Sequence, residues 1–413
     1  MDLRDTPQQE DFRAECRDWL QQNAPTQLLP QLEASSFGRS AFGPGEYITH
    51  SKEWQATKAE GGWACIDWPK EYGGRSATPI QRVIWNQEEG LYGQLAAPFI
   101  IGHGMCAPTL MSYATEEQKE RFLPPMASGE EIWCQLFSEP VAGSDLAGIR
   151  TRAVRDGDEW VINGQKVWTS GAQHSDWGIL VARSDFDVPK HKGMIFFFLD
   201  MRSPGIEIRP IRQAAGDAGF NEVFLTNVRI PDAQRLGGER EGWAVSLTTL
   251  MNERLAIGGS MRTGFDELLE FAQQVQLESG PAIDDPSVRD RLADWAVRAF
   301  GLRTIGYRAY TALSQGQMPG PENSIGKIVA GNSMQEIATL ALELQEEAGA
   351  LVDAEDLSLK GKFPHMLMRS LGTRIEGGTD EILKNIIAER VLQLPGDIRV
   401  DRDVSFTEIP SGS

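Results

Sequence analysis

The spacing of apolar positions divides the chain into three regions, and the first, up to about residue 130, is mainly helical. Over residues 11–22 the apolar side chains fall on one helix face: Phe12, Cys16, Trp19 and Leu20. Thr115 can cap a helix and Gln118 completes a capping box, which predicts a helix beginning there. The segment 68–74 (WPKEYGG) is expected to be a loop between helices.

The middle region follows a strand-like pattern instead. Asn163-Gly164 separates two apolar runs, 160–162 and 166–168, and this dipeptide supplies the positive φ angles of a tight turn. The sequence therefore predicts a hairpin with its turn at Asn163-Gly164. Further strand-like runs follow at 177–181, 194–199, 206–211 and 223–230. Proline and glycine separate these runs at spacings typical of a small barrel or sandwich.

From about residue 241 the helical period returns in long amphipathic segments, at 243–276, 288–313, 324–349 and 380–392. Asp285-Pro286 supplies a cap and a first-turn proline for the second of them. We therefore predict an α+β multidomain fold: a helical N-terminal domain, a β-barrel or β-sandwich domain and a C-terminal four-helix bundle. The predicted boundaries are 1–130, 131–240 and 241–395, followed by a polar tail at 396–413.

Composition narrows the class of partner. The 413-residue chain carries 40 basic and 59 acidic side chains, a net charge of −19, which argues against binding to nucleic acid. Apolar residues (41%) and charged residues (24%) are at the levels of an ordinary globular protein. The chain lacks a run of about 18 apolar residues. Its charged start does not resemble a signal peptide, so we expect a cytoplasmic protein without membrane association.

Three familiar chemistries find little support in the sequence. The four cysteines are far apart and form no CxxC, so we expect buried thiols and neither disulfides nor a zinc site: Cys16, Cys65, Cys106 and Cys134. The five histidines form no HxxxH pair, so we expect no metal. Residues 102–107 (GHGMCA) satisfy the GxGxxA fingerprint, but no βαβ alternation surrounds them. This segment therefore indicates close helix packing and not a dinucleotide site.

The richest candidate chemistry lies between residues 135 and 170. The segment 137–145 (FSEPVAGSD) is a turn-rich loop with free backbone amides and two hydroxyls, which can bind a planar heterocycle or a phosphate. About 25 residues later, Trp168, Thr169 and Ser170 offer an aromatic plate beside hydroxyls. Taken singly, each piece is more simply a polar turn or a core tryptophan.

Together with other segments, these pieces resemble the acyl-CoA dehydrogenase family. The matching segments occur in family order over most of the chain: 68–74, 116–124 (EEQKERFLP), 128–130 (SGE), 137–145, 163–170 (NGQKVWTS) and 379–391 (TDEILKNIIAERV). The resemblance implies a helical N-terminal domain, a β-domain and a C-terminal four-helix bundle. It also implies FAD as cofactor and α,β-dehydrogenation of an acyl-CoA thioester in lipid degradation.

The resemblance assigns the flavin ring to the middle domain. Phe137, Ser138 and Trp168 would line the ring, and Ser170 would hydrogen-bond near its reactive edge. Gly143 belongs to the same cofactor loop. The next residue of the loop, Ser144, would lie where the loop meets the flavin phosphates or the pantetheine arm of the substrate.

Further cofactor contacts are implied in the C-terminal region. Gln345 and Gly349 match a Gln-x-x-x-Gly that receives the adenine half of FAD from a neighbouring subunit. Thr379 and Glu381 match positions at the start of the last helix, where a helix N-terminus suits an anionic pyrophosphate. The family's Arg-x-x-Phe-Gly, which touches FAD across the dimer, is missing from 276–291, and Arg289 or Arg291 could substitute.

Two glutamates compete for the role of catalytic base. Many family members carry the base directly before Gly-Thr, but that position is Gly377 here and Glu376 stands one residue early. A minority, resembling the isovaleryl and long-chain enzymes, take the base from a helix as Glu-Arg, which matches Glu253 and Arg254. We therefore favour Glu253, with Gly377 donating its backbone amide to the thioester oxygen. Arg254, Ser144 and Gly377 would contact the substrate.

The resemblance implies partners and also leaves alternatives. It implies an acyl-CoA substrate, an electron-transferring flavoprotein as acceptor, and a homodimer or homotetramer, with a heterotetramer as a further possibility. A flavin oxidase or monooxygenase on the same fold is an alternative, as is a non-catalytic subunit of a heterotetrameric dehydrogenase. The length and branching of the acyl group stay open.

Overall fold

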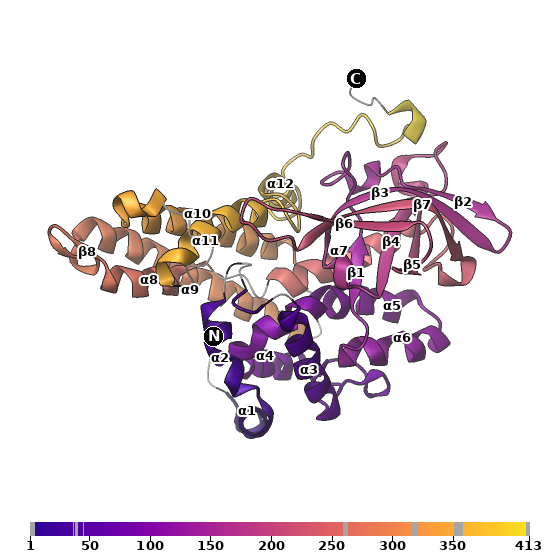
Figure 1. Ribbon diagram of the computed structural model, residues 1–413. Helices are drawn as coiled ribbons and strands as arrows, with labels where there is room; N and C mark the ends of the chain where they lie inside the picture. Colours follow the sequence, from indigo (N-terminus) through magenta and orange to yellow (C-terminus); the bar gives the residue numbers. More distant parts are fainter. Residues whose placement is uncertain are drawn as a thin grey trace.

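A computed structural model describes residues 5–35, 37, 40–43, 45–258, 263–315, 317, 320–350 and 358–409, without the side chains of 254–258, 310, 313–314 and 360. Figure 1 shows the chain in three parts: helices of the first third, a sheet of the middle third, and a second set of helices. The predicted order of helical, β and helical domains is confirmed.

The N-terminal helices enclose an aromatic core. They are α1 (Pro7–Asn23), α2 (Leu29–Ala34), α3 (Glu46–Glu60), α4 (Pro79–Glu88), α5 (Ala107–Tyr113) and α6 (Glu116–Ser128). Helix α1 buries the expected face through Phe12, Cys16 and Leu20. Thr115 and Gln118 form the predicted capping box of α6. These caps and buried faces fix the N-terminal layer against which the sheet packs.

The GxGxxA segment is helical, as its surroundings indicated. Gly102–Cys106 forms one turn of π-helix that continues directly into α5. Within this turn the His103 ring stacks on Phe99 at 5.6 Å, and its Nε2–H donates to the Met126 carbonyl over 2.8 Å. Burial lowers the pKa of His103 to about 4, so the ring is neutral at neutral pH.

The middle domain is one curled sheet. Its described strands are β1 (Trp133–Leu136), β2 (Arg152–Asp156), β3 (Glu159–Ser170), β4 (Trp177–Arg183), β5 (Met194–Asp200), β6 (Ile206–Ile211) and β7 (Phe220–Pro231). The order is β1-β4-β2-β3-β7-β6, and β5 pairs with β4. Strand β1 runs parallel to β4, with Trp133 opposite Trp177, and β3 runs antiparallel to β7.

The predicted turn at Asn163-Gly164 is wrong. Strand β3 runs through both residues, and the actual turn is at Gly157-Asp158, between the paired residues Asp156 and Glu159. Glycine is needed at 164 for a different reason: a Cβ there would meet Thr151 Oγ1 at 2.3 Å. The Asn-Gly pair therefore marks a close approach beside β2 and a small irregularity in the pairing with β7.

The C-terminal region contains a four-helix bundle, but its members differ from those predicted. Its described helices are α7 (Gly242–Gly258), α8 (Phe265–Gln274), α9 (Pro286–Ser314), α10 (Ser324–Glu343), α11 (Leu359–Thr373) and α12 (Asp380–Arg390). A shared core joins α8, α9, α10 and α11. The predicted single helix 243–276 is thus two helices, and α11 was not predicted. The Asp285 cap is confirmed, since its Oδ1 accepts from the N–H groups of Ser287 and Val288.

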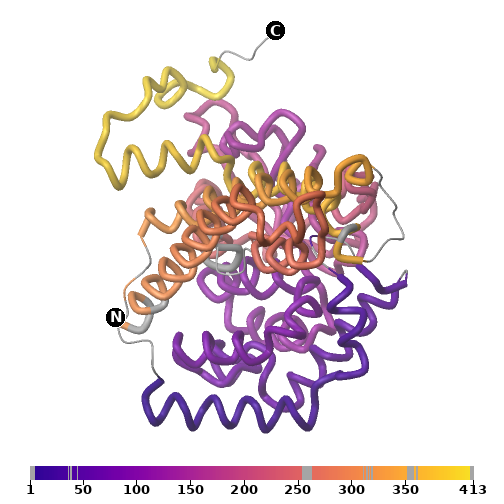
Figure 2. Tube along the Cα trace, turned by 90° about the vertical axis from the view of Figure 1, so that its left-hand side faces the viewer, coloured from indigo at the N-terminus to yellow at the C-terminus, as the bar shows by residue number. Residues whose placement is uncertain are grey.

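The tail after α12 is described as far as residue 409. Figures 1 and 2 show it leaving α12 and running back to the β-domain, where it forms a short 3-10 turn, Phe406–Glu408. No single helix of the described residues is long and apolar enough to cross a membrane; the bent pair Gly90–Phe99 and Gly102–Tyr113 passes that test only when taken together.

Candidate active site

The loop of residues 137–145, here called the flavin loop, leaves the end of β1 and folds into a tight turn. Glu139 and Ala142 exchange two backbone hydrogen bonds of 3.0 Å each. Phe137 is buried, whereas Gly143 and Ser144 are exposed. A Cβ added to Gly143 would have no atom within 4 Å. The tip of the loop therefore presents backbone and a hydroxyl to open space, as a ligand-binding turn requires.

A buried ion pair fixes this loop to β3. The Lys166 Nζ donates to the Phe137 carbonyl over 2.9 Å and to Glu139 Oε1 over 2.8 Å. Glu139 also accepts from the N–H groups of Arg150 and Thr151, at 2.6 and 2.9 Å. Burial alone would raise the pKa of Glu139, but the Lys166 charge and these hydrogen bonds hold it below its ordinary value. The pair was not identified from the sequence, although both residues lie inside the quoted motifs.

Trp168 points outward beside this loop. The pairing of β3 with β7 shifts between Lys166 and Thr169, and Trp168, inside the shift, has a φ of +61°. Its side chain is 57% exposed, so the simpler interpretation as a core tryptophan is wrong. The neighbouring Val167 N–H donates to the Ser138 carbonyl over 2.9 Å. The bulge thus sets an aromatic plate next to the flavin loop, and half-buried Ser170 follows on the same strand.

Glu253 lies next to the start of the flavin loop. Its Oε2 accepts from Gln135 Nε2 over 3.2 Å, and Gln135 stands two residues before Phe137. Helix α7 is anchored there by a buried 2.8 Å hydrogen bond between the hydroxyls of Thr249 and Thr109. Glu253 itself is partly buried. The side chain of Arg254 lies outside the described part of the chain.

Glu376 is engaged elsewhere. Its Oε1 accepts from Arg369 Nη2 over 2.6 Å, an ion pair made with a residue of α11. The next two residues, Gly377 and Gly378, have φ angles of +61° and +95°. A side chain at either position would sit in the left-handed region, which favours glycine. This turn suits a backbone contact better than it suits a base.

The same turn is held rigidly above α12. Asp380, whose side chain is 2% exposed, accepts from Arg374 Nε over 2.8 Å. Lys327 donates to the Gly378 carbonyl. Thr379 Oγ1 accepts from the Ile382 N–H over 3.2 Å and so caps α12. The backbone of Gly377 therefore has a fixed direction, and the first turn of α12, including exposed Glu381, keeps its orientation.

Gln345 and Gly349 lie away from the flavin loop. They follow α10, and Figure 1 shows the end of α10 at the opposite end of the helical domain from the sheet. A helix of 20 residues spans about 30 Å, so the two ends are far apart. The Gln345 Nε2 is buried without a hydrogen-bond partner. A Cβ on Gly349 would meet the Leu342 carbonyl oxygen at 2.2 Å, so the chain is closely packed there.

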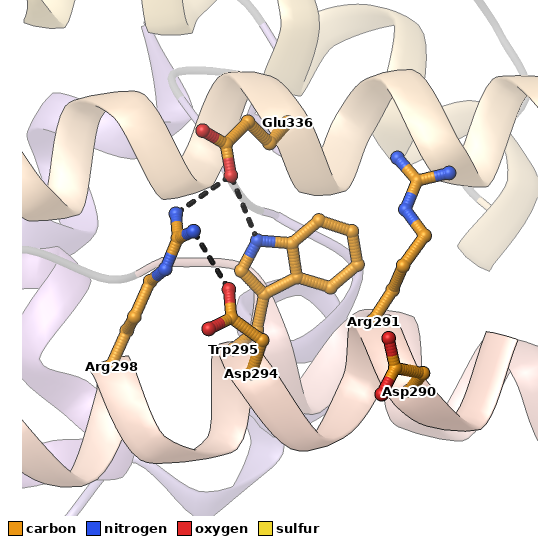
Figure 3. A pocket seen from close by; sticks show the side chains of 6 residues that line it. All are labelled: Asp290, Arg291, Asp294, Trp295, Arg298 and Glu336. Carbon is orange, nitrogen blue, oxygen red and sulfur yellow. Dashed lines mark hydrogen bonds and ion pairs between the residues drawn. The ribbon is translucent and has the colours of Figure 1, made fainter. Parts of the chain in front are cut away.

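A surface hollow lies near this end, between α9 and α10 (Figure 3). Arg298 pairs with Asp294 and Glu336, each at 2.7 Å, and Trp295 Nε1 donates to Glu336 over 3.1 Å. Arg291 also lines the hollow and pairs over 3.2 Å with Glu343, two residues before Gln345. Arg289, in contrast, donates to the Ile283 carbonyl, and no ion pair joins it to another described residue. Of the two arginines suggested by the sequence, Arg291 is the one that reaches the C-terminal end of α10, through Glu343.

The cysteines are buried, as the sequence predicted. All four cysteines are buried and free, and burial raises the pKa of Cys16 and Cys134 to about 12. Across the described ranges no group of three or more histidine, cysteine, aspartate or glutamate side chains is placed to hold a metal ion.

Comparison with known proteins gives the family. Three sequence profiles match in succession: acyl-CoA dehydrogenase, N-terminal domain, over residues 6–130; middle domain, over 134–228; and C-terminal domain, over 240–392. The chain belongs to the acyl-CoA dehydrogenase family. It is therefore an oxidoreductase, and its three-domain architecture is that of acyl-CoA dehydrogenases.

Individual relatives are similar over most of the chain. The acyl-CoA dehydrogenase IpdE1 of Mycolicibacterium smegmatis is 35% identical over 94% of this chain and 99% of its own. The acyl-CoA dehydrogenase FadE34 of Mycobacterium tuberculosis is 39% identical over 83% of this chain, and the match spans about half (46%) of FadE34. The solved "Tcur3481-Tcur3483 steroid ACAD" matches 96% of this chain and 100% of its own with a TM-score of 0.80 at 27% identity. The ChsE4-ChsE5 complex from Mycobacterium tuberculosis matches 96% and 100% with a TM-score of 0.75 at 29% identity.

Acyl-CoA dehydrogenases are flavoproteins that bind FAD, and the residues present fit that cofactor. The Trp168 ring is exposed and follows Val167, which is bonded to Ser138 of the flavin loop, and the tip of that loop is open. The Gln345 Nε2 is buried without a partner and could donate a hydrogen bond to an adenine nitrogen. The structure brings together Phe137, Ser138, Trp168 and Glu253 in one chain. It does not bring Gln345 and Gly349 to them.

Proposed function

We propose that this chain catalyses the FAD-dependent dehydrogenation of an acyl-CoA thioester to the trans-2-enoyl-CoA, with Glu253 as the base. The observation that carries the assignment is the contact of Glu253 with Gln135, at the entry to the flavin loop. The competing candidate, Glu376, is less suited to the role because its carboxylate is already paired with Arg369.

Each group has a role in this proposal. Glu253 takes the α-proton onto its carboxylate, and the fixed amide of Gly377 donates to the thioester oxygen as the enolate develops. Phe137, Ser138, Trp168 and Ser170 hold the flavin ring, while Ser144 and Arg254 contact the substrate. FAD, when bound, supplies the acceptor for the hydride that leaves the β-carbon. An electron-transferring flavoprotein then takes the electrons.

A neighbouring subunit completes the FAD site in this proposal. Gln345 and Gly349, at the far end of α10, would receive the adenine half of a cofactor held by the β-domain of the partner. Thr379 and Glu381, at the start of α12, would contact the cofactor elsewhere. Arg291 pairs with Glu343 at the end of α10 and would stand in for the missing Arg-x-x-Phe-Gly. Measuring FAD per subunit on the chain expressed alone tells whether the neighbouring subunit is identical or different. About one FAD per chain supports an identical neighbour, and the absence of bound FAD supports a second, related chain.

The substrate class is proposed from relatives. One similar solved structure is named a steroid acyl-CoA dehydrogenase, so we place bulky, steroid-linked acyl groups first. The test is a panel of acyl-CoA thioesters, short, medium, branched and steroid-linked, scored by anaerobic bleaching of the flavin absorbance. Bleaching by one class, with transfer of electrons to an artificial acceptor, supports the proposal. Bound FAD that no thioester bleaches would contradict it, and steady peroxide formation in air would favour an oxidase instead.

A further inference from the structure

The C-terminal tail binds the β-domain at a defined place. Ser405 forms a β-bridge with Pro189, and the Phe406 N–H donates to the Val188 carbonyl over 2.9 Å. Both partners lie in the connection between β4 and β5. The sequence predicted only a polar tail, yet residues 401–408 are docked on the domain that carries the flavin loop (Figure 1).

One contact of the tail reaches the flavin loop through a single lysine. The Lys190 Nζ donates to Asp145 Oδ1 over 2.8 Å and also to the Asp401 carboxylate of the tail. Asp145 is the last residue of the flavin loop. The Lys190 side chain is 9% exposed, and that of Asp145 is 58% exposed. The tail thus supplies the more buried of the two carboxylates on this ammonium, at 29% exposed.

A second contact covers a buried arginine. Arg183 is fully buried and donates to three carbonyls, those of Ala147, Ile149 and Lys190. Among the described residues it has no carboxylate within ion-pair distance. The centre of the Phe406 ring lies 3.7 Å from its guanidinium carbon, closer than the Phe186 ring at 5.7 Å, so the tail supplies the nearer π face to this buried cation. Arg183 in turn fixes the residues that directly follow the flavin loop.

We propose that residues 396–409 form a strap that positions the far end of the flavin loop, with Asp401 and Phe406 as positioning residues. The near end of the loop is held inside the domain by Lys166 and Glu139. The far end depends on Lys190 and Arg183, two cations that the strap contacts through the Asp401 carboxylate and the Phe406 ring. The proposal rests on the proposed function only for the identity of the ligand that the loop binds.

Hydrogen–deuterium exchange of the full chain tests the strap without reference to turnover. We expect Asp401→Asn and Phe406→Leu to speed exchange in 143–150 and 186–192 by about tenfold, as for the loss of one local anchor. Asp401→Glu and Phe406→Tyr, which keep the carboxylate and the ring, should stay close to the parent protein. Asp403→Asn is the matched control, because Asp403 is an exposed carboxylate on the same tail.

A chain ended after residue 395 provides the second arm. We expect it to fold, to show the same faster exchange in 143–150, and to lose FAD faster or to raise KM for the thioester while kcat at saturation is unchanged. Unchanged exchange in 143–150 after removal of the whole tail would overturn the strap. Equal effects of Asp403→Asn and Asp401→Asn would overturn the role of Asp401. If none of the thioesters bleaches the flavin of the parent protein, the proposed function is wrong. The exchange result for the strap would still stand.

Discussion

Lys166 and Glu139 form an ion pair of 2.8 Å that is almost wholly buried beneath the flavin loop, with side chains 0% and 5% exposed. The two residues come from different segments, since Glu139 lies in the loop after β1 and Lys166 lies in β3. Their hydrogen bonds also reach the Phe137 carbonyl and two backbone amides. One lysine therefore fixes the shape of the loop from the inside.

Replacing this lysine should unfold the site and not merely weaken it. Lys166→Met leaves the Glu139 carboxylate buried without its cation, and removal of one partner of a buried pair costs about 3–5 kcal/mol. Urea unfolding of the apoprotein measures the loss, and FAD content should fall with it. The double variant Lys166→Met/Glu139→Gln removes both charges and should recover part of the stability. A single variant within about 1 kcal/mol of the parent would show that the pair is not a structural anchor.

The base assignment predicts different turnover for variants of the two glutamates. Glu253→Gln should keep its FAD and lose turnover by about 10²-fold or more, the usual effect of removing a general base. Glu376→Gln is the matched control, because its carboxylate is held by Arg369, and it should stay within a few-fold of the parent. Rapid-mixing reduction of the flavin by the best thioester is the measurement. The opposite order of the two variants would transfer the base to Glu376.

Trp168 should matter for the cofactor and little for the fold. Its side chain is 57% exposed, so Trp168→Ala should change the unfolding free energy of the apoprotein by no more than about 0.5 kcal/mol. Affinity for FAD should fall about tenfold or more, because stacking of a heterocycle on an aromatic side chain contributes about 1–3 kcal/mol. Trp168→Phe keeps a ring and should retain most of the affinity. Isothermal titration of apoprotein with FAD checks both variants, and a large loss of apoprotein stability would show that Trp168 is a core residue.

His103, in the π-helical turn, should make the stability of the folded protein depend on pH. The pKa of His103 is about 4 in the folded protein and 6.5 in an unfolded chain, so only the unfolded chain takes up the proton between these values. Stability should therefore fall as the pH drops from about 6.5 towards 4, by at most about 3 kcal/mol from this residue. His103→Gln should flatten the curve of urea midpoint against pH. Equal curves for the parent and His103→Gln would refute the prediction.

Local pattern was enough for the strands and for the order of domains. Proline and glycine bound most of the strand runs, and the run 206–211 coincides with β6. Helix α11 was missed because Pro364 and two glycines interrupt its helical pattern, and only packing in the bundle core overrides them. Asn163-Gly164 was misinterpreted because the atom that demands glycine, Thr151 Oγ1, belongs to another strand. Such contacts between segments are not visible in a local window.

For the candidate site too, local motifs predicted some features and contacts between distant segments decided the others. The motifs located the flavin loop, Trp168 and Glu253, since each lies in a contiguous segment. The outward direction of Trp168 depends on a shift in the pairing with β7, and Glu376 is occupied by Arg369 only after α11 has folded. The docking of the tail depends on Arg183 and Lys190, more than 200 residues earlier in the chain. Long-range partners of this kind decide roles that residue types alone leave open.

The bulge in β3 also sets what kinds of change this strand can accept. Side chains of a strand alternate between its two faces, so loss of one residue between the Gly157-Asp158 turn and Lys166 would carry the lysine out of the core. The same loss would move Trp168 away from the flavin loop. An added residue in the exposed turn itself leaves the alternation intact. The length of β3 is therefore fixed by Lys166 and Trp168, two residues that must face opposite ways.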